Sequence, residues 1–334
     1  MQGPASLLAQ IKCQRVALAF SGGADSLALA LCLAYLCQSS SKSLILFHIH
    51  HGLMAAADDW LDACQQLANQ LGLKFVARQV KVDQDSGLGM EGAARQARYQ
   101  ALQGLAAEHE VEAIFLAHHL QDHAENLLIR LFRGAGVKGM SGMQVQRGLQ
   151  HSSEPLRYYR PWLDIERHYL IDLAQHWETL TGWRYIRDPS NLDQQYKRGA
   201  IRTQLIPVLQ KIWPTWPHQL ARFAHIMQET QGLLDELAVL DLQQLEPDTD
   251  YLSFSLKAWR ELSEARQVNV IRYWLSLHHQ LMPSEKRLQE WLKQLRHVHQ
   301  LGFDRDVRLK HQQTEIRLQK GRVRLYGVES KKDH

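Results

Sequence analysis

Short apolar runs and longer amphipathic stretches alternate along the first two hundred residues. The apolar runs, which predict strands, cover residues 16–20, 44–49, 75–80 and 111–117. Helical patterns follow them at residues 26–38, 56–72, 91–108 and 122–133. Strands that are apolar almost throughout and alternate with helices are typical of a parallel sheet covered on both faces. We therefore expect an α/β, Rossmann-like domain whose ligand lies beyond the carboxyl ends of the strands.

The alternation ends at residues 213–217, where two prolines among tryptophans cannot continue the helix expected over residues 197–211. Amphipathic helices are predicted beyond this point, over residues 218–245, 261–280 and 284–299. Arginines alternate with apolar residues between positions 305 and 326, which indicates short strands with a basic face. We expect a first domain over residues 1–212 and a second, mostly helical domain with a short basic β tail over residues 213–334.

Composition narrows the class of protein. The chain has 334 residues, and no apolar stretch approaches the length needed to span a bilayer. Its start lacks the layout of a secretory signal, so we expect a cytoplasmic protein without a membrane partner. Four scattered cysteines indicate neither a disulfide framework nor a zinc knuckle. A net charge of +4 permits a nucleic-acid partner, and the oligomeric state stays open, with a homodimer allowed.

The segment that joins the first strand to the first helix predicts a phosphate-binding loop. It consists of Ser21, Gly22, Gly23, Ala24, Asp25 and Ser26. Two adjacent glycines let successive N–H groups and the helix N-terminus point at one anion, and the serine hydroxyls can add donors. No lysine occurs between Lys12 and Lys42, so the loop is not the P-loop of kinases and GTPases. An ordinary Gly-Gly turn is the alternative.

Polar residues follow two further strands. His50 and His51 lie at the end of the second strand, and residues 118–125 begin after the strand that ends at Ala117. Within the latter segment, Asp122 and Glu125 are three positions apart and share one helical face. The parallel sheet predicts that both segments face the same cleft as the loop. A helix N-cap is the alternative role for Asp122.

Arginines recur in pairs at helical spacing. Arg95 and Arg98 lie at i and i+3, and Arg198 and Arg202 at i and i+4, so each pair presents two cations for phosphate or carboxylate. Arg98 also has a structural ion pair as its alternative role. Arg130 and Arg133 precede the glycine-rich residues 134–142, which read as a mobile loop closing over a ligand or as a plain flexible connection.

The loop at residues 21–26 resembles the SGGxDS pyrophosphate loop of the N-type ATP pyrophosphatases, and residues 14–325 together resemble the tRNA(Ile)-lysidine synthetase family. Five further segments match the family in order. They are residues 47–53, residues 89–99, residues 117–126 with Arg130, Arg133, Gly134, Gly136 and Gly142, residues 160–163 with Arg167, and residues 188–191 with Arg198 and Arg202. Six elements in the family's order identify more than the loop alone, which identifies only the superfamily.

The resemblance implies an adenine nucleotide alpha hydrolase-like catalytic domain that uses ATP and Mg²⁺. Family members adenylate the C2 oxygen of the wobble cytidine of tRNA(Ile) with a CAU anticodon. They then ligate free L-lysine at C2 and release AMP and pyrophosphate. The second domain is implied to bind the tRNA, and its basic tail is compatible with either a phosphate-tracking surface or a solvated sheet edge.

The resemblance also implies roles for single residues. ATP binding falls to residues 21–26, with His50 and His51, and a magnesium ion to Asp25 and Asp122. The residues expected at the reaction are Asp25, Asp122, Glu125, Arg98 and Arg198, with Asp122 and Glu125 serving for metal binding or for capture of the lysine ammonium. Contacts with lysine or tRNA are expected from Glu91, Arg95, His118, Arg130, Arg133 and Arg202.

Three other readings remain open. Eighteen histidines allow a His-rich metallohydrolase built on His48, His50, His118, His119 and His123. A tRNA thiolase of the same superfamily is a second alternative, which we disfavour because no cysteine adjoins a motif loop. A non-catalytic tRNA-binding relative is a third, because the chain departs from the family pattern at Gln121, His123, Asn126 and Gly199.

Overall fold

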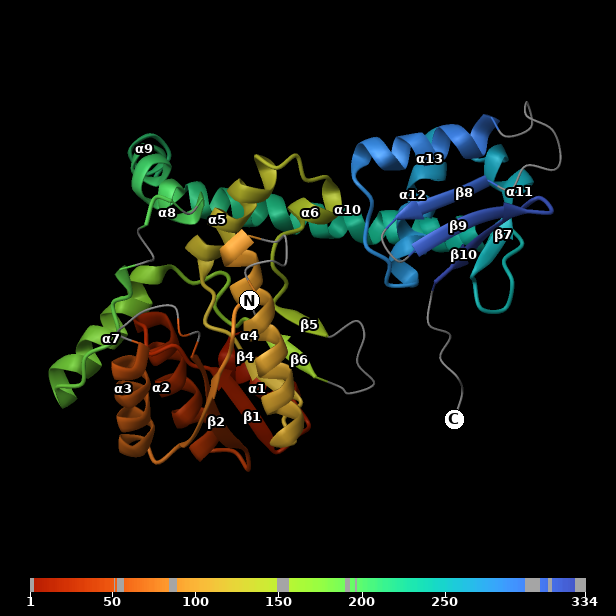
Figure 1. The fold of residues 1–334 in the computed structure, drawn as a ribbon. Coiled ribbons are helices and arrows are strands. Elements are labelled where there is room, and N and C mark those ends of the chain that lie inside the picture. The colour runs from red at the N-terminus through yellow and green to blue at the C-terminus, as the bar shows by residue number, and fades with distance from the viewer. Residues whose placement is uncertain are drawn as a thin grey trace. The chain divides into compact units, whose positions relative to one another are not determined.

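A six-stranded sheet in the order β3-β2-β1-β4-β6-β5 organises the N-terminal part of the chain (Figure 1). Its strands are β1 (Arg15–Ala19), β2 (Ser43–His50), β3 (Lys74–Gln79), β4 (Ala113–Phe115), β5 (Gln146–Gly148) and β6 (Arg157–Tyr159). Neighbouring strands pair in parallel, except that β5 runs antiparallel to β6. The chain builds outward from β1 in both directions, so the strand order reverses between β1 and β4. Such a switch point opens a crevice at the carboxyl ends of the strands.

This computed structural model describes residues 3–50, 52, 57–83, 89–148, 156–189, 193–195, 197–297, 307–311 and 314–327. Its contacts divide the chain into two units, Met1–Gln228 and Glu229–His334. The predicted domain boundary at residue 213 stays a prediction. The helix α9 (Ile206–Ile212) ends there and α10 (Trp216–Gln244) begins shortly after, whereas the contacts divide the chain after Gln228. The helix α10 starts in the first unit and continues into the second.

Helices cover both faces of the six-stranded sheet. The helices before α9 are α1 (Pro4–Gln10), α2 (Ala24–Gln38), α3 (Ala57–Gln70), α4 (Gly89–Glu108), α5 (Leu120–Leu131), α6 (Val137–Met140), α7 (Arg167–Thr181) and α8 (Lys197–Ala200). Val16 and Leu18 of β1 pack into one core with α1, α2, α3 and α7, whereas Ala17 packs into another with α4. Alternate residues of a strand point to opposite faces, which explains why the strands are apolar throughout.

The helix expected over residues 197–211 is interrupted. A π-helix, η2 (Ile201–Leu205), separates α8 from α9, and the N–H of Ile206 bonds to the carbonyl of Ile201. Pro207 follows directly and has no N–H to donate, while its ring crowds the carbonyl four residues earlier. Widening the turn relieves that crowding. The wider turn holds Arg202.

The second unit combines helices with a four-stranded antiparallel sheet in the order β7-β10-β9-β8. After α10 come β7 (Ser253–Ser255), α11 (Leu256–Glu261), α12 (Glu264–Leu277), α13 (Glu285–His297), β8 (Val307–His311), β9 (Thr314–Gln319) and β10 (Arg322–Tyr326). Its core includes the fully buried Trp259 and Trp274. Arginines of the predicted basic tail take part in local contacts: Arg317 pairs with Glu315, and Arg324 lies 3.6 Å from Asp248.

The α/β fold with a parallel sheet is as predicted, and the strands and helices that precede residue 133 differ from prediction mainly at their ends. The sequence pattern missed α1, α7 and the pair β5 and β6, which lie among the turns and short apolar segments. Among the described residues, no helix is long and apolar enough to cross a membrane.

Candidate active site at the carboxyl edge of the sheet

The loop after β1 has the backbone geometry of an anion cradle. Gly22 has φ +79°, and a Cβ there would lie 2.3 Å from Cδ1 of Ile186 and 2.7 Å from Sγ of Cys64. Gly23 is the N-cap of α2 and has no side chain to cover the first N–H groups of that helix. Those groups are therefore left to face an anion. Ser26 is buried and its hydroxyl donates to the carbonyl of Gly23 at 3.0 Å, which fixes the turn.

Asp25 lies where the loop enters α2 and meets groups from two other segments. Its Oδ1 accepts a hydrogen bond from Nε of Arg167 at 3.3 Å, and its Oδ2 lies 3.8 Å from Nε2 of His119. Arg167 begins α7, and His119 precedes α5. The carboxylate is thus placed between the strand ends of β1 and β4, in the predicted crevice.

A reciprocal capping box holds the start of α5. Nδ1 of His119 accepts the N–H of Asp122 at 3.3 Å, and the N–H of His119 donates to Oδ2 of Asp122 at 3.5 Å. Because Nδ1 accepts, the proton of the neutral imidazole lies on Nε2, which faces Oδ2 of Asp122 at 3.3 Å as well as Asp25. The N-cap of α5 is therefore His119, and the alternative reading of Asp122 as the N-cap is wrong. Asp122 stands at the third helical position, where its carboxylate completes the capping box and also borders the crevice.

Two arginines from the interrupted helix cover Glu125. Nε of Arg202 donates to Oε1 of Glu125 at 2.9 Å, and its Nη2 reaches Oδ1 of Asp122 at 3.1 Å. Nε of Arg198 lies 3.5 Å from Oε2 of Glu125. The Glu125 side chain is only 4% exposed, so these cations compensate a buried carboxylate. The structure thus brings together both members of the predicted acidic pair and both of the predicted arginines.

The electrostatics of this cluster favour ionised partners. Burial acts to raise the pKa of Asp122, but electrostatic interactions with His119, His118, Arg198 and Arg202 outweigh it and hold that pKa below its usual value. Burial acts to lower the pKa of Arg202, yet its hydrogen bond to Glu125 and the nearby carboxylates raise it. A mixed cluster of permanent charges can bind a zwitterion or a phosphate with its metal ion.

Several histidines of the site are buried. Burial is the main cause that lowers the pKa of His118 to about 3 and that of His123 to about 4. His123 accepts the N–H of Met143 at 3.3 Å and packs against Gly142, so this departure from the family pattern fills a structural position. His50 is buried at the end of β2, with Nε2 3.1 Å from Asp58. His51 lies outside the described residues.

The arginines of α4 lie next to an aromatic cluster. Arg95 stacks over the ring of Tyr99 with Cζ 5.0 Å from the centroid, and it donates to the Tyr99 hydroxyl at 3.3 Å. The buried Arg160 approaches the same hydroxyl at 3.5 Å. Arg98 is exposed on α4. The Glu91 side chain lies outside the part of the chain that the structure describes.

Arg130 holds the glycine-rich segment instead of projecting from it. Its Nη1 donates to the carbonyls of Gly139 and Gly142 at 2.7 and 3.3 Å. The segment contains the short helix α6, and Ser141 bonds to Met227 and Gln228 of α10. Arg133 is exposed at the end of α5. The segment therefore contains a short helix, and its closing over a ligand stays a prediction.

Comparison with known proteins identifies the family to which this chain belongs. The PP-loop domain family matches residues 4–209, and the TilS substrate binding domain matches residues 254–324. A tRNA(Ile)-lysidine synthase of Bordetella parapertussis is 45% identical over 309 residues, which cover 92% of this chain and 88% of that protein. This chain belongs to the tRNA(Ile)-lysidine synthase family. Another member, from Pseudomonas fluorescens, is 40% identical over 264 residues, which cover 77% of this chain and 57% of that protein.

A solved structure outside the family has the same fold. The U34-tRNA thiolase of Methanococcus maripaludis superposes with a TM-score of 0.52 at 19% identity, covering 64% of this chain and 72% of the thiolase. At this identity the likeness extends to the fold alone. The predicted superfamily and family are both confirmed. The match to the PP-loop domain family covers residues 21–26, and we call this segment the PP-loop below.

One argument against a thiolase needs correction, because a cysteine does adjoin the PP-loop in space. Cys64 of α3 is fully buried and packs beneath Gly22. The contact was not visible in sequence, since the two residues come from different elements. Burial raises the pKa of this thiol to about 12, so it remains protonated at neutral pH. A buried, protonated thiol is a packing group and a poor nucleophile.

The carboxylates fit magnesium better than a transition metal. No group of three or more His, Cys, Asp or Glu side chains among the described residues is arranged to hold a metal ion. Mg²⁺, however, is commonly held by one or two carboxylates together with water and phosphate oxygens. Asp25 and Asp122 both approach Nε2 of His119 and are a donor set of that kind.

The sequence analysis did not assign three further residues to this site. His119 links both aspartates, Arg167 contacts Asp25, and the Gln121 side chain accepts the N–H of Arg167 at 2.9 Å. Arg167 stood in a matched motif without an assigned role. The position of His119 directly before α5 was the signal for a capping residue.

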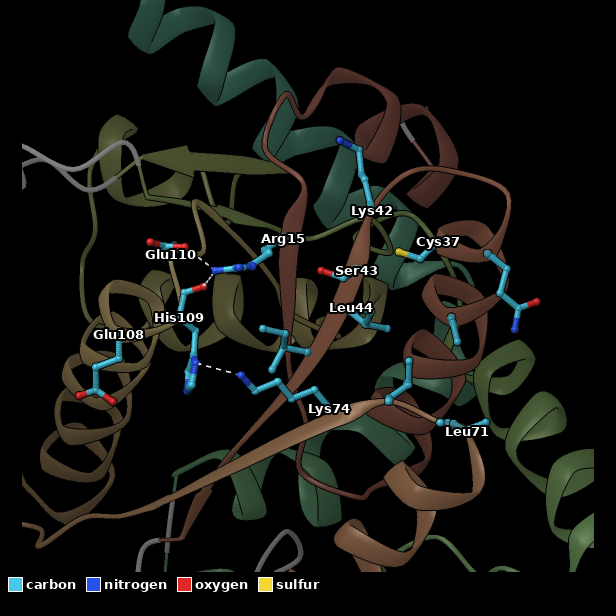
Figure 2. Close-up of a pocket in the computed structure, with 15 residues that line it drawn as sticks. Arg15, Cys37, Lys42, Ser43, Leu44, Leu71, Lys74, Glu108, His109 and Glu110 are labelled. Carbon is cyan, nitrogen blue, oxygen red and sulfur yellow. Dashed lines mark hydrogen bonds and ion pairs between the residues drawn. The ribbon is translucent and has the colours of Figure 1, made fainter.

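A separate pocket of about 800 Å³ lies at the opposite end of the sheet (Figure 2). Arg15, Ser43 and Lys74, which begin β1, β2 and β3, line it. Figure 2 shows Arg15 directed toward Glu110 and Lys74 toward His109. None of the predicted site residues belongs to its lining, and the PP-loop lies at the other ends of these strands.

Proposed function

We propose that this lysidine synthase family member adenylates the C2 oxygen of the wobble cytidine in tRNA(Ile) with a CAU anticodon. Free L-lysine then displaces AMP to form lysidine. The observation that carries the proposal is the convergence of Asp25, Asp122 and Glu125 beside the PP-loop, with Arg202 bonded to two of these carboxylates. Membership of the family supports the same reaction.

Separate groups of residues are proposed for ATP and for magnesium. We assign ATP to residues 21–26 with His50 and His51, and the metal to Asp25 and Asp122. Magnesium would neutralise charge on the phosphates as the bond to pyrophosphate breaks. His119 holds the two aspartates in register through Nε2. We propose that the protein works in the cytoplasm, with ATP and tRNA as its partners.

Lysine and tRNA are assigned to the remaining cluster. An ammonium group is best matched by carboxylates, which assigns it to Asp122 and Glu125. Arg98, Arg198 and Arg202 are then the proposed cations for the lysine carboxylate or for phosphate. For contacts with lysine or tRNA we propose Glu91, Arg95, His118, Arg130, Arg133 and Arg202. For tRNA binding we also propose a second domain over residues 213–334. The oligomeric state stays open, and sedimentation would show whether the protein forms the homodimer that the sequence allows.

A direct assay tests the reaction. The protein is incubated with ATP, magnesium, radiolabelled lysine and tRNA(Ile) with a CAU anticodon, and label in RNA digests is counted. We expect incorporation by the wild type and its loss in Asp25→Ala. A wild-type protein that is folded and binds ATP but incorporates no lysine would refute the proposal. Arg184→Ala, at an 87% exposed side chain, is the control variant.

A further inference from the structure

The guanidinium of Arg167 stands at the mouth of the PP-loop. It comes from the first residue of α7, 142 positions after Asp25, and contacts that aspartate through Nε at 3.3 Å. The Arg167 side chain is 47% exposed, whereas the Asp25 side chain is 24% exposed. The guanidinium is therefore accessible from solvent.

Arg167 has donors to spare. A guanidinium carries five N–H groups, of which four belong to the two Nη atoms. In the part of the chain that the structure describes, the side chain of Arg167 makes one hydrogen bond, through Nε. The Nη groups are thus free to bind a ligand while Nε keeps its contact with Asp25.

Neighbouring elements hold the backbone of Arg167 in place. The side chain of Gln121, in the first turn of α5, accepts the N–H of Arg167 at 2.9 Å. The N–H of Leu120 bonds to the carbonyl of Ile165 at 3.0 Å, which ties the same two segments a second time. Glu166 also bonds to His218 of α10 at 2.8 Å. Gln121 is one of the departures from the family pattern, and its amide connects α5 to α7.

The chemistry of the loop calls for a cation at this place. The PP-loop has no lysine, so its donors are neutral N–H and hydroxyl groups, and Asp25 adds a negative charge. Pyrophosphate gains negative charge as it leaves, and a fixed cation next to it lowers the barrier. The planar guanidinium suits phosphate oxygens, because two N–H groups bind them side by side.

We propose that Arg167 binds the pyrophosphate portion of ATP through its Nη groups, and that Gln121 is the residue that positions it. This inference rests on the proposed use of ATP. In the adenylation step the cytidine C2 oxygen attacks the α-phosphorus, and the bond from that phosphorus to the bridging oxygen breaks. The electron pair stays on the departing pyrophosphate, where Arg167 compensates the charge.

Calorimetric titration of the full chain with magnesium pyrophosphate, and separately with AMP, tests this role. For Arg167→Ala we expect pyrophosphate affinity to fall about 10- to 100-fold, the range for losing charge-assisted hydrogen bonds, with AMP affinity unchanged. Gln121→Leu should give a smaller loss of the same selectivity. Arg184→Ala, which removes an arginine paired with Glu178 at 3.7 Å, should bind both ligands normally.

The outcomes separate this inference from the proposed reaction. Unchanged pyrophosphate affinity in Arg167→Ala, or an equal loss for AMP and pyrophosphate, overturns the role of Arg167. Failure of the wild type to bind pyrophosphate overturns it as well. A selective loss of pyrophosphate binding supports it even where the wild type forms no lysidine, in which case the proposed reaction alone fails.

Discussion

The guanidinium of Arg202 and the carboxylate of Glu125 form a buried ion pair, with Nε 2.9 Å from Oε1. Residues from two different helical segments are thereby fixed against each other. The arrangement depends on the π-helix η2, which changes the direction of side chains next to Arg202 relative to an unbroken α-helix.

Removal of Arg202 should cost much stability. Arg202→Ala leaves Glu125 buried with Arg198 as its remaining cation, and we expect the free energy of unfolding to fall by about 3 kcal/mol. Urea denaturation followed by circular dichroism measures the change. The double variant Glu125→Gln with Arg202→Met should lose less, because position 125 then carries no buried charge that has lost Arg202. If Arg202→Ala unfolds at the same urea concentration as the wild type, the ion pair does not stabilise the fold and the prediction is wrong.

The two glycines of the PP-loop should differ in their tolerance to substitution. In Gly22→Ala the new methyl group meets Ile186 and Cys64 at a positive φ, so ATP binding and stability should both be lost. Gly23→Ala is the matched control, because its nearest neighbour, Oγ of Ser21, would lie at an ordinary 3.6 Å. Equilibrium binding of ATP and thermal unfolding compare them. Equal behaviour of the two variants would refute the packing beneath Gly22.

Substitution of Gly199, where the sequence departs from the family pattern, should destabilise this chain. A Cβ on Gly199 would lie 1.9 Å from the carbonyl oxygen of Asp193, so the backbone would have to move. We expect Gly199→Asn and Gly199→Ala each to lower the free energy of unfolding by at least about 1 kcal/mol, as overpacking does.

The control for position 199 is Gly232→Ala in α10, where no atom lies within 4 Å of the added methyl group. That substitution should be neutral or stabilising, because alanine favours a helix over glycine. Urea denaturation of the three variants gives the comparison. If Gly199→Asn is as stable as the wild type, the backbone of residues 193–195 can move without cost and the prediction is wrong.

The acid sensitivity of the fold should depend in part on His48. Burial lowers the pKa of His48, which donates through Nδ1 to the carbonyl of Phe20 at 3.0 Å. The unfolded chain therefore binds a proton below about pH 6.5 that the native state resists, and stability falls as the pH drops from there toward the lowered native pKa. His48→Asn keeps a donor but does not titrate. Unfolding free energies measured at pH 5 and pH 7.5 should differ less in this variant than in wild type, and an unchanged difference would contradict the prediction.

Cys64 should resist alkylation in the native protein. Because burial raises the pKa of its thiol to about 12, only about one thiol in ten thousand is ionised at pH 8. Iodoacetamide treatment followed by peptide mass spectrometry should leave Cys64 unmodified until denaturant is added. The half-buried Cys32 is the internal comparison. Rapid labelling of Cys64 in the folded protein would mean that the space beneath the PP-loop opens.

The sequence by itself determined the parallel sheet, the PP-loop, the family and most of the charged residues of the site. Local information suffices for these features, because apolar periodicity, glycine pairs and helical spacing are properties of short segments. It did not predict α7 or the strands β5 and β6, since their segments are short or lack a clear period. Nor did it show that the Arg130 side chain donates hydrogen bonds to the carbonyls of Gly139 and Gly142.

Only the tertiary structure decided which of these residues meet. Asp25, His119 and Arg167 come from three segments, and their contact follows from the strand order around β1 and from the position of α7. The same holds for Cys64 under Gly22 and for Asp193 against Gly199. Partners distant in the chain leave no local pattern, because the packing of whole elements sets their distance.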